Sequence, residues 1–346
     1  MPTHAFSIPS CLARLARARL GRRLGGLAMG AALAGAPALP AAAADGFPNK
    51  PVRVVVGFAP GGGADVVARL VGAKMSNVLG QQVVVENRPG ATGTIAADNV
   101  ARSPADGYSM FLGSQSTMIV APNMYPNLAF DPIKDFTPIS QMVSMPLVLV
   151  VNPNLVKATT LAELTEELKH KGDGNTTYAS SGQGGPQHIA GELYKKMIGM
   201  NITHVPYKGE SAAIADVLGG HVPFMFANLP VAQPHVANGR LRALAITSLA
   251  RSEKVPEIPT LHESGFKDFE VLTWYGVFAP AKTPEPVVAK LSESILRSLE
   301  DPDLRRSLDE QGLTIIGSTP AEFGRMLETE APRWSKLIKE MGLRPE

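Results

Sequence analysis

The sequence predicts an α/β fold in two domains, and three observations lead to this prediction. Short apolar strands alternate with amphipathic helices from about residue 52 to residue 247. Glycine-rich turns stand between several strands and the helices that follow them. The same order of strand, glycine-rich turn and helix occurs near residue 60 and again near residue 182. Alternation at this spacing is typical of parallel strands, and ligands of such sheets bind beyond the carboxyl ends of the strands.

The first 44 residues have the composition of a secretory signal peptide. Five arginines between Arg14 and Arg23 precede a small apolar run at 24–36, which prolines and alanines follow up to Ala44. A membrane anchor is the competing interpretation, but two prolines interrupt the apolar region and alanine and glycine dominate it. We therefore expect cleavage near Ala44 and export to the periplasm. The pair Arg22 and Arg23 leaves open whether export is Sec-dependent or follows the twin-arginine route.

Charge and cysteine content exclude several classes of protein. The 33 basic and 31 acidic residues give a net charge of +2, but five of the arginines lie in the segment that is removed, which leaves −3. No basic run with interleaved aromatic residues remains, so nucleic acid is not expected as a partner. The single cysteine, Cys11, also lies in the removed segment, so the mature chain has no thiol chemistry.

A glycine turn early in the mature chain predicts an anion-binding site. Gly61, Gly62 and Gly63 separate a strand at 52–56 from an amphipathic helix. Glycine has no Cβ, so the backbone N–H groups of this turn can approach a ligand closely. The helix directs its free N–H groups to the same place, which favours a carboxylate or a phosphate. Asp65 either caps this helix or contacts the ligand, and both interpretations stay open.

The remaining elements of the first half repeat this arrangement. A strand at 82–86 ends in a second glycine turn before a helix at 94–102. A strand at 108–112 ends in the polar turn Gly113-Ser114-Gln115-Ser116. The very apolar strand at 146–151 then begins a new unit.

The second half has the same pattern with a different sequence. Thr160 is expected to cap a helix at 161–170, because Glu163 follows it at capping-box spacing. A strand at 176–179 leads into the turn SSGQGGP at 180–186. The further expected elements are a helix at 187–197, a strand at 202–205, a helix at 211–218, strands at 222–226, 243–247 and 270–279, and helices at 284–299, 302–311 and 320–341.

These elements predict where the domains begin and end. The extended run at 270–279 follows the second unit and leads back to the first sheet. Two strands near Val148 and Trp274 would then cross between the domains and serve as the hinge. The expected parts are a signal peptide at 1–44, a discontinuous first domain at 45–147 plus 273–346, and an inserted second domain at 148–272.

The glycine turns do not match nucleotide-binding motifs. A Walker loop requires lysine after its last glycine, whereas Ala64 follows Gly63. The turn at 182–184 lacks the third glycine of a dinucleotide fingerprint. His188 and Glu192 lie four residues apart, but no further histidine or cysteine joins them at ligand spacing. We expect neither a cofactor nor a bound metal.

A hydrolase is the alternative class. Ser181 and His188 lie close together in sequence, although no Gly-x-Ser-x-Gly motif surrounds the serine. A receptor would retain its ligand stoichiometrically, whereas a hydrolase would turn it over. Tyr207 either lies at the edge of a cleft or belongs to a surface turn, whereas Trp274 and Tyr275 either form the wall of the cleft or are core aromatic residues.

Several ordered motifs resemble those of one family. They are KPVRVVVGFAPGGGADVVAR at 50–69, ENRPGATGTIAADNVARSPADGY at 86–108, HVPYKG at 204–209 and LRALAITS at 241–248. The chain resembles the Bug family of extracytoplasmic solute receptors, the TctC-like components of tripartite tricarboxylate transporters. The resemblance implies a monomeric, two-domain periplasmic binding protein of type II that is not an enzyme. Such a protein closes around a small organic acid and delivers it to a membrane permease, or signals its presence to a sensor.

The resemblance also implies which residues contact the ligand. They are Phe58, Ala59, Gly61, Gly62, Asp65, Ser114, Gln115, Gly182, Gly184, Gly185, His188, Tyr207, Ala227 and Asn228. Ala227 stands where the family motif has an acid, and Pro186 where it usually has a hydroxyl residue. With Lys208 as the only nearby base and no acid to pair with an ammonium group, we expect a carboxylate ligand without an amine.

Overall fold

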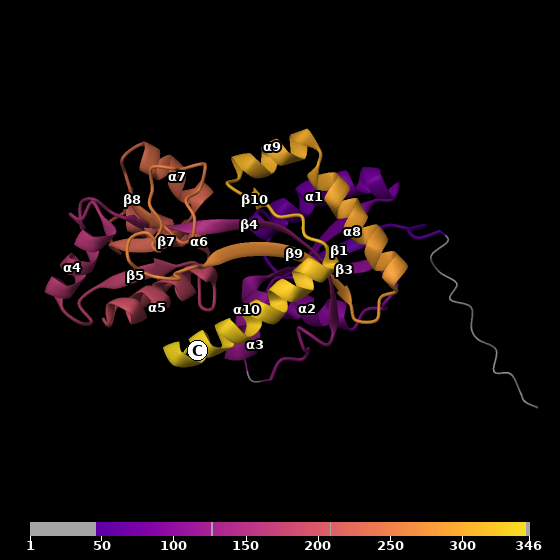
Figure 1. Cartoon of the computed structure of the whole chain (residues 1–346), viewed down its shortest axis with the longest axis horizontal. Helices are drawn as coiled ribbons and strands as arrows, with labels where there is room; N and C mark the ends of the chain where they lie inside the picture. Colours follow the sequence, from indigo (N-terminus) through magenta and orange to yellow (C-terminus); the bar gives the residue numbers. More distant parts are fainter. Residues whose placement is uncertain (1–45, 126, 208, 344–346) are drawn as a thin grey trace, which may run out of the picture. The chain divides into compact units, whose positions relative to one another are not determined.

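The computed structural model describes residues 46–125, 127–207 and 209–343, which belong to one compact unit (Figure 1). The predicted signal peptide at 1–44 and Lys208 lie outside the described residues. Within the described ranges, no helix has both the length and the apolar character needed to cross a membrane.

The first group of strands forms a mixed sheet. Strand β1 pairs in parallel with β2 and β3, whereas β9 is antiparallel to both β3 and β4. The short strand β10 pairs antiparallel with β4. The bounds are β1 Val52–Val56, β2 Val83–Asn87, β3 Ser109–Ser114, β4 Phe136–Val151, β9 Leu272–Pro280 and β10 Thr314–Ile315.

The second group of strands is also mixed and is reached through β4. Strand β5 is parallel to β6 and β7, while the last residues of β4 are antiparallel to β7 and β8. These strands are β5 Thr177–Ser180, β6 Thr203–Pro206, β7 Phe224–Asn228 and β8 Arg242–Ile246. Residues 136–146 of β4 pair with β9 and residues 147–151 pair with β7, so β4 crosses from one group to the other. The predicted α/β fold with mixed strand pairing is confirmed, and β4 joins the two groups of strands into one ten-stranded sheet.

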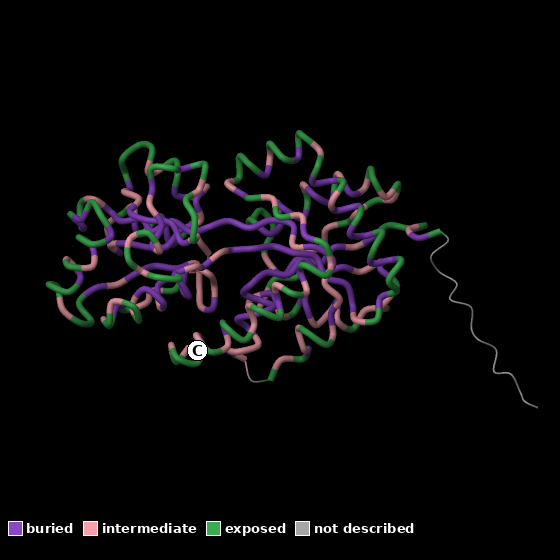
Figure 2. The backbone as a smooth tube through the Cα atoms, viewed as in Figure 1, coloured by how far each residue is buried: buried purple, intermediate pink, exposed green. Residues whose placement is uncertain are grey.

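Helices cover both groups of strands. The strands are mostly buried, whereas the helices and loops around them carry most exposed residues (Figure 2). The helices are α1 Gly63–Leu79, α2 Thr94–Ala101, α3 Ala121–Met124, α4 Leu161–Lys171, α5 Pro186–Ile198, α6 Glu210–Leu218, α7 Leu229–Ala237, α8 Glu285–Leu299, α9 Pro302–Glu310 and α10 Pro320–Met341. The short segments Ala91–Gly93 and Ser116–Val120 are 3₁₀ and π-helical turns.

The short elements α3, β10 and the two helical turns were not predicted, and two longer regions also differ from the sequence prediction. Strand β4 begins at Phe136, ten residues before the predicted strand at 146–151. Pro138 and Pro146 lie within β4, and proline inside a strand argues against a strand when only the sequence is known. The register of β4 against β9 shifts after Pro138. Helix α7 was not predicted, because Pro234 lies inside it.

Close packing fixes β9 against the C-terminal helix. A Cβ on Gly276 would lie 2.3 Å from the ring of Phe323 on α10, so only glycine fits there. Phe323 also contacts Trp274 edge-on, with ring centroids 5.6 Å apart. These contacts hold in place the strand that carries two residues of the site described next.

Candidate functional site

A cavity of ≈ 700 Å³ lies beyond the carboxyl ends of β1, β3, β5 and β7. Each of these strands is followed directly by residues that line the cavity. The lining residues are Phe58, Ala59, Pro60, Gly61, Gly62, Gly63, Ala64, Thr92, Ser114, Gln115, Ser116, Ser181, Gly182, Gln183, Gly185, Pro186, Gln187, Gly209, Glu210, Ser211, Asn228, Val231, Thr273 and Tyr275.

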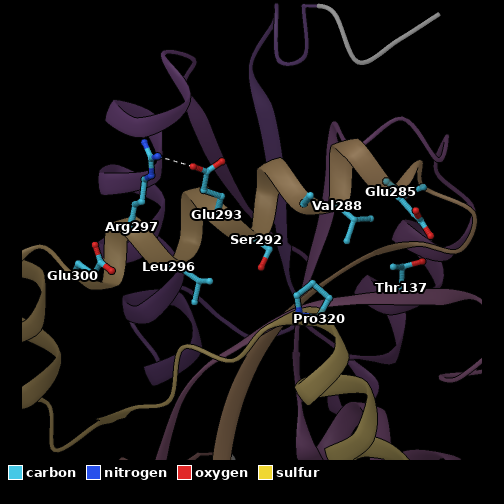
Figure 3. A pocket seen from close by; sticks show the side chains of 11 residues that line it. Thr137, Glu285, Val288, Ser292, Glu293, Leu296, Arg297, Glu300 and Pro320 are labelled. Atoms are coloured by element: carbon cyan, nitrogen blue, oxygen red, sulfur yellow. Dashed lines mark ion pairs between the residues drawn. The ribbon is translucent and has the colours of Figure 1, made fainter. Parts of the chain in front are cut away.

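Another hollow, of ≈ 610 Å³, runs along α8 (Figure 3). Side chains of one helix face dominate it, including Val288, Leu296 and the ion pair of Glu293 with Arg297 (2.6 Å). No glycine turn contributes to it. The cavity at the strand ends is therefore the candidate site.

Four helices begin at this cavity. The residues that precede the first turns of α1, α5, α6 and α7 are Gly62, Gly185, Gly209 and Asn228, and all four line the cavity. None of them caps its helix with a side-chain hydrogen bond. Helix N-termini carry partial positive charge and free N–H groups, so together they favour an anionic ligand.

The first glycine turn presents backbone to the cavity. Gly61 has φ +81°, a conformation that side chains disfavour. Gly62 has φ −80° and ψ 167°, which other residues adopt freely, and a Cβ on Gly62 would have only the Ala59 carbonyl within 4 Å. A side chain at Gly62 would therefore enter the cavity rather than disturb the fold.

Asp65 supports this turn from behind. Its carboxylate accepts hydrogen bonds from Gly61 N–H (2.9 Å), Arg69 Nε (3.0 Å) and Asn87 Nδ2 (2.9 Å). Asn87 Nδ2 also donates to the carbonyl of Phe58 (3.1 Å). Burial alone would raise the pKa of Asp65, but the hydrogen bonds from Arg69, Gly61 and Asn87 hold it below its usual value. Asp65 is only 3% exposed and is absent from the cavity lining.

The second glycine turn is held by side chains. Ser181 Oγ donates to Gln187 Oε1 (2.7 Å), and Gly184 N–H donates to His188 Nδ1 (3.1 Å). His188 is buried and stacks on His204, with ring centroids 4.0 Å apart. Burial lowers the pKa of His188 to about 4 and that of His204 to about 3, so both rings are neutral near pH 7. Gly184 and His188 lie behind the cavity wall.

The geometry of a hydrolase is not assembled from the residues that the sequence suggested. The hydroxyl of Ser181 is directed to Gln187 and not to His188. The serine–histidine hydrogen bond of this region joins Ser180 Oγ to His204 Nε2 (2.6 Å). Ser180 is fully buried and does not line the cavity.

Two other predicted residues also lie away from the cavity. Tyr207 donates its hydroxyl to Asp216 Oδ2 (2.6 Å), and the tyrosine does not line the cavity. Ala227 is fully buried in the core, paired with Val148 across β4 and β7. The predicted residues that do reach the cavity are Phe58, Ala59, Gly61, Gly62, Ser114, Gln115, Gly182, Gly185 and Asn228.

Sequence reasoning missed Glu210. Its carboxylate accepts from the backbone N–H of Asn228 (2.6 Å) and from Asn228 Nδ2 (2.6 Å). Burial raises the pKa of Glu210, although hydrogen bonds from Asn228 and Gln187 oppose the rise. The one signal for it was an acid directly after the predicted turn at 206–209, a position usually explained by the helix dipole.

Strand β9 contributes alternate residues. Thr273 and Tyr275 line the cavity, and Trp274 between them packs into the core. Of the two aromatic residues considered for the wall, only Tyr275 reaches it. Burial, and then the negative charge of Glu210, raises the pKa of Tyr275.

Comparison with known proteins identifies close relatives. The family model described as tripartite tricarboxylate transporter family receptor (TctC) matches residues 67–343. Protein BugT of Bordetella pertussis (strain Tohama I) is 36% identical over 300 residues, covering 86% of this chain and 91% of BugT. The solved structure of the periplasmic binding protein BugD is 35% identical, with a TM-score of 0.76 over 86% of this chain and 100% of BugD. That of R. palustris Rpa4515 with adipate is 34% identical, with a TM-score of 0.78 over 86% of this chain and all of its own (100%).

Proposed function

The chain belongs to the TctC family of tripartite tricarboxylate transporter receptors, and we propose that its own ligand is a small carboxylate bound in the ≈ 700 Å³ cavity. One observation carries the proposal. Four helix N-termini meet at the cavity, and none is capped by the side chain of its own N-cap residue. Among the described residues that line the cavity there is no Lys, Arg or His, and the one acid, Glu210, accepts the N–H of Asn228 before α7. The charge of a carboxylate is then balanced by backbone N–H groups and helix dipoles.

We assign the ligand carboxylate to the first glycine turn. Gly61 and Gly62 combine an accessible backbone with the start of α1, which is 17 residues long. The adipate present in the Rpa4515 structure shows that a protein of this fold holds a carboxylic acid. The proposed contacts are Phe58, Ala59, Gly61, Gly62, Ser114, Gln115, Gly182, Gly185 and Asn228, while Asp65, Gly184, His188, Tyr207 and Ala227 support the walls.

Ligand capture would proceed by hinge closure. The proposed domains remain 45–147 plus 273–346 and 148–272, because β4 changes its pairing partner from β9 to β7 after Pro146. The second connection between the proposed domains lies at Val271, just before β9 begins. The N–H of Val271 donates to the carbonyl of Thr247. Contacts from both domains would stabilise the closed state.

The receptor would act in the periplasm, as the periplasmic protein BugD does, and deliver its ligand to a membrane permease. A receptor that serves a sensor would have the same cavity. We propose no catalytic role, because the hydroxyl of Ser181 is directed to Gln187 and away from His188.

The test is to identify what copurifies with the exported protein. Mass spectrometry under native and then denaturing conditions should find one carboxylate per chain, released unchanged. Isothermal titration of the ligand-free protein should restore the same stoichiometry. Steady conversion of the compound to a product would contradict a receptor, and a copurified compound without a carboxylate would contradict the assigned ligand class.

A further inference from the structure

One of the four anion-binding helix ends at the cavity is already occupied by the protein's own carboxylate. Glu210 is the first residue of α6, and both of its carboxylate oxygens accept N–H groups of Asn228, which precedes α7. These two hydrogen bonds are short, at 2.6 Å each. The side chain of Gln187, at the start of α5, also favours the charged form of this carboxylate. Burial raises the pKa of Glu210, and these N–H donors oppose that rise because they stabilise the ionised carboxylate.

Asn228 adds a second acceptor at this end. Because Nδ2 donates to Glu210, the orientation of the amide is fixed and the oxygen Oδ1 points elsewhere. Oδ1 is buried and has no hydrogen-bond partner among the described residues. A buried oxygen without a donor is costly, so an N–H group of a bound ligand would stabilise this atom.

The hydroxyl of Thr273 is in the same condition. Thr273 is 6% exposed, lines the cavity, and its Oγ1 has no partner within the described part of the chain. Tyr275, on the same side of β9, connects this end with the first glycine turn. Its hydroxyl oxygen lies 3.2 Å from where a Cβ on Gly63 would be.

The cavity therefore has a donor end at the first glycine turn and an acceptor end at Glu210 and Asn228. Resting on the proposed function, we propose that the ligand carries one carboxylate and, at its other end, a cation with N–H groups such as a primary ammonium, and that Glu210 determines this specificity. A second carboxylate would face the charge of Glu210 at close range. An ammonium group would instead find Glu210 and the free oxygen of Asn228, so its burial is compensated.

This proposal reverses the expectation drawn from Ala227. The absence of an acid at that position does not matter for the ligand, because residue 227 lies in the core against Val148. Glu210 supplies the missing acid from a different element. The adipate of the Rpa4515 structure has a carboxylate at each end, so we expect a different ligand preference in this chain.

The test uses three sets of acids matched in length. They are succinate, butyrate and 4-aminobutyrate; glutarate, pentanoate and 5-aminopentanoate; and adipate, hexanoate and 6-aminohexanoate. Affinities of the ligand-free exported protein are measured by isothermal titration. In at least one set, the amino acid should bind about tenfold or more tightly than the dicarboxylate of equal length.

Variants of Glu210 identify the cause of the preference. Glu210→Gln should abolish it, and Glu210→Asp, which keeps the charge, should retain it in part. Glu285→Gln is the matched control, because Glu285 is the first residue of α8 and lies outside the cavity. Circular dichroism and melting temperature establish that each variant is folded.

The outcomes separate the two proposals. Tighter binding of the dicarboxylates by the wild type, or an amine preference that survives in Glu210→Gln, would overturn the assigned specificity and leave the carboxylate receptor intact. Failure of all nine acids to bind would overturn the specificity and count against the proposed function as well. Loss of the preference in Glu210→Gln alone supports the proposal.

Discussion

Two acids near helix starts, Asp65 on α1 and Glu210 on α6, have opposite relations to the cavity. Asp65 accepts hydrogen bonds from Gly61 N–H, Arg69 and Asn87, all on its own side of the cavity, and it lies behind the wall. Glu210 accepts from Asn228 at the start of a different helix, and it lines the cavity. An acid in the first turn of a helix therefore supports the wall at the donor end of the cavity (the donor wall) in one case, and forms the wall at the acceptor end (the acceptor wall) in the other.

The difference lies in which N–H groups each carboxylate reaches. Asp65 uses the N–H of Gly61, so its hydrogen bond fixes the turn while the rest of the turn's backbone faces the cavity. Glu210 accepts the N–H of Asn228, directly before α7, so this N–H is already paired within the protein. The carboxylate of Glu210 thus changes the cavity in two ways: it adds a negative charge, and it takes up an N–H donor at a helix N-terminus.

The largest expected effect comes from blocking the donor wall. Gly62→Val should weaken ligand binding by about 100-fold or more, or about 2.7 kcal/mol, because its side chain enters the space of the ligand carboxylate. The backbone at Gly62 (φ −80°, ψ 167°) accommodates valine, so the fold should persist. Isothermal titration measures the affinity, and Gly324→Val on α10, where the nearest side-chain atom is 3.7 Å away, is the control. Unchanged affinity in the folded Gly62 variant would place the carboxylate site elsewhere.

The next largest effect is expected from Asp65, which supports the donor wall through its hydrogen bonds. Asp65→Asn should lower the free energy of unfolding by about 1–3 kcal/mol, because Arg69 and Gly61 lose a charged acceptor in a buried site. Urea denaturation monitored by circular dichroism checks this. The control is Asp98→Asn, which removes a similar i,i+4 pair with the exposed Arg102 and should change stability by about 0.5 kcal/mol or less. Equal losses in both variants would mean that the buried network does not brace the turn.

A pH series tests the support of the second glycine turn. His188 and His204 have folded-state pKa values of about 4 and about 3, below the ordinary value of 6.5. The unfolded chain therefore binds more protons below pH 6.5, and stability falls as the pH drops from 6.5 towards 4. Each histidine contributes about 1.4 kcal/mol per pH unit in that range.

The measurement is the urea midpoint between pH 7.5 and pH 5. His204→Phe should make the acid-side loss shallower, whereas His170→Gln, at an exposed histidine of α4, should leave it unchanged. A His204→Phe profile parallel to that of the wild type would show that the stacked pair is not the cause.

The smallest effect is expected behind the acceptor wall. Tyr207→Phe removes the hydrogen bond to Asp216 and should cost about 1 kcal/mol of stability with little change in ligand affinity. Thermal unfolding and titration of the same sample separate the two quantities. A large loss of ligand affinity at unchanged stability would instead indicate that Tyr207 contacts the ligand.

The sequence alone predicted the glycine turn that forms part of the first wall of the cavity. Gly61–Gly63 between strand and helix predicted an anion site, and the turn does connect β1 to α1 at the cavity. Asn87 of β2 adds hydrogen bonds to Phe58 and Asp65 that the spacing did not indicate. The N-terminus of α4 was predicted in the same way, because Thr160 caps the N–H of Glu163 three residues ahead (3.2 Å). Strand β1 has the predicted bounds of 52–56 for the same local reason.

Only the tertiary structure decided the second wall. Glu210 meets Asn228 across 18 residues of sequence, and their contact depends on α6 and α7 beginning side by side at the cavity. Ala227 and Asn228 are neighbours in sequence, yet Ala227 packs against Val148 in the core and Asn228 lines the cavity. The reason is that β7 ends at Asn228, directly before α7 begins. Strand direction and helix placement determine which way each side chain points, and neither quantity is local to the residue. The glycine turn at one end of the cavity was therefore predictable from spacing, whereas the residues that meet at the other end required the fold.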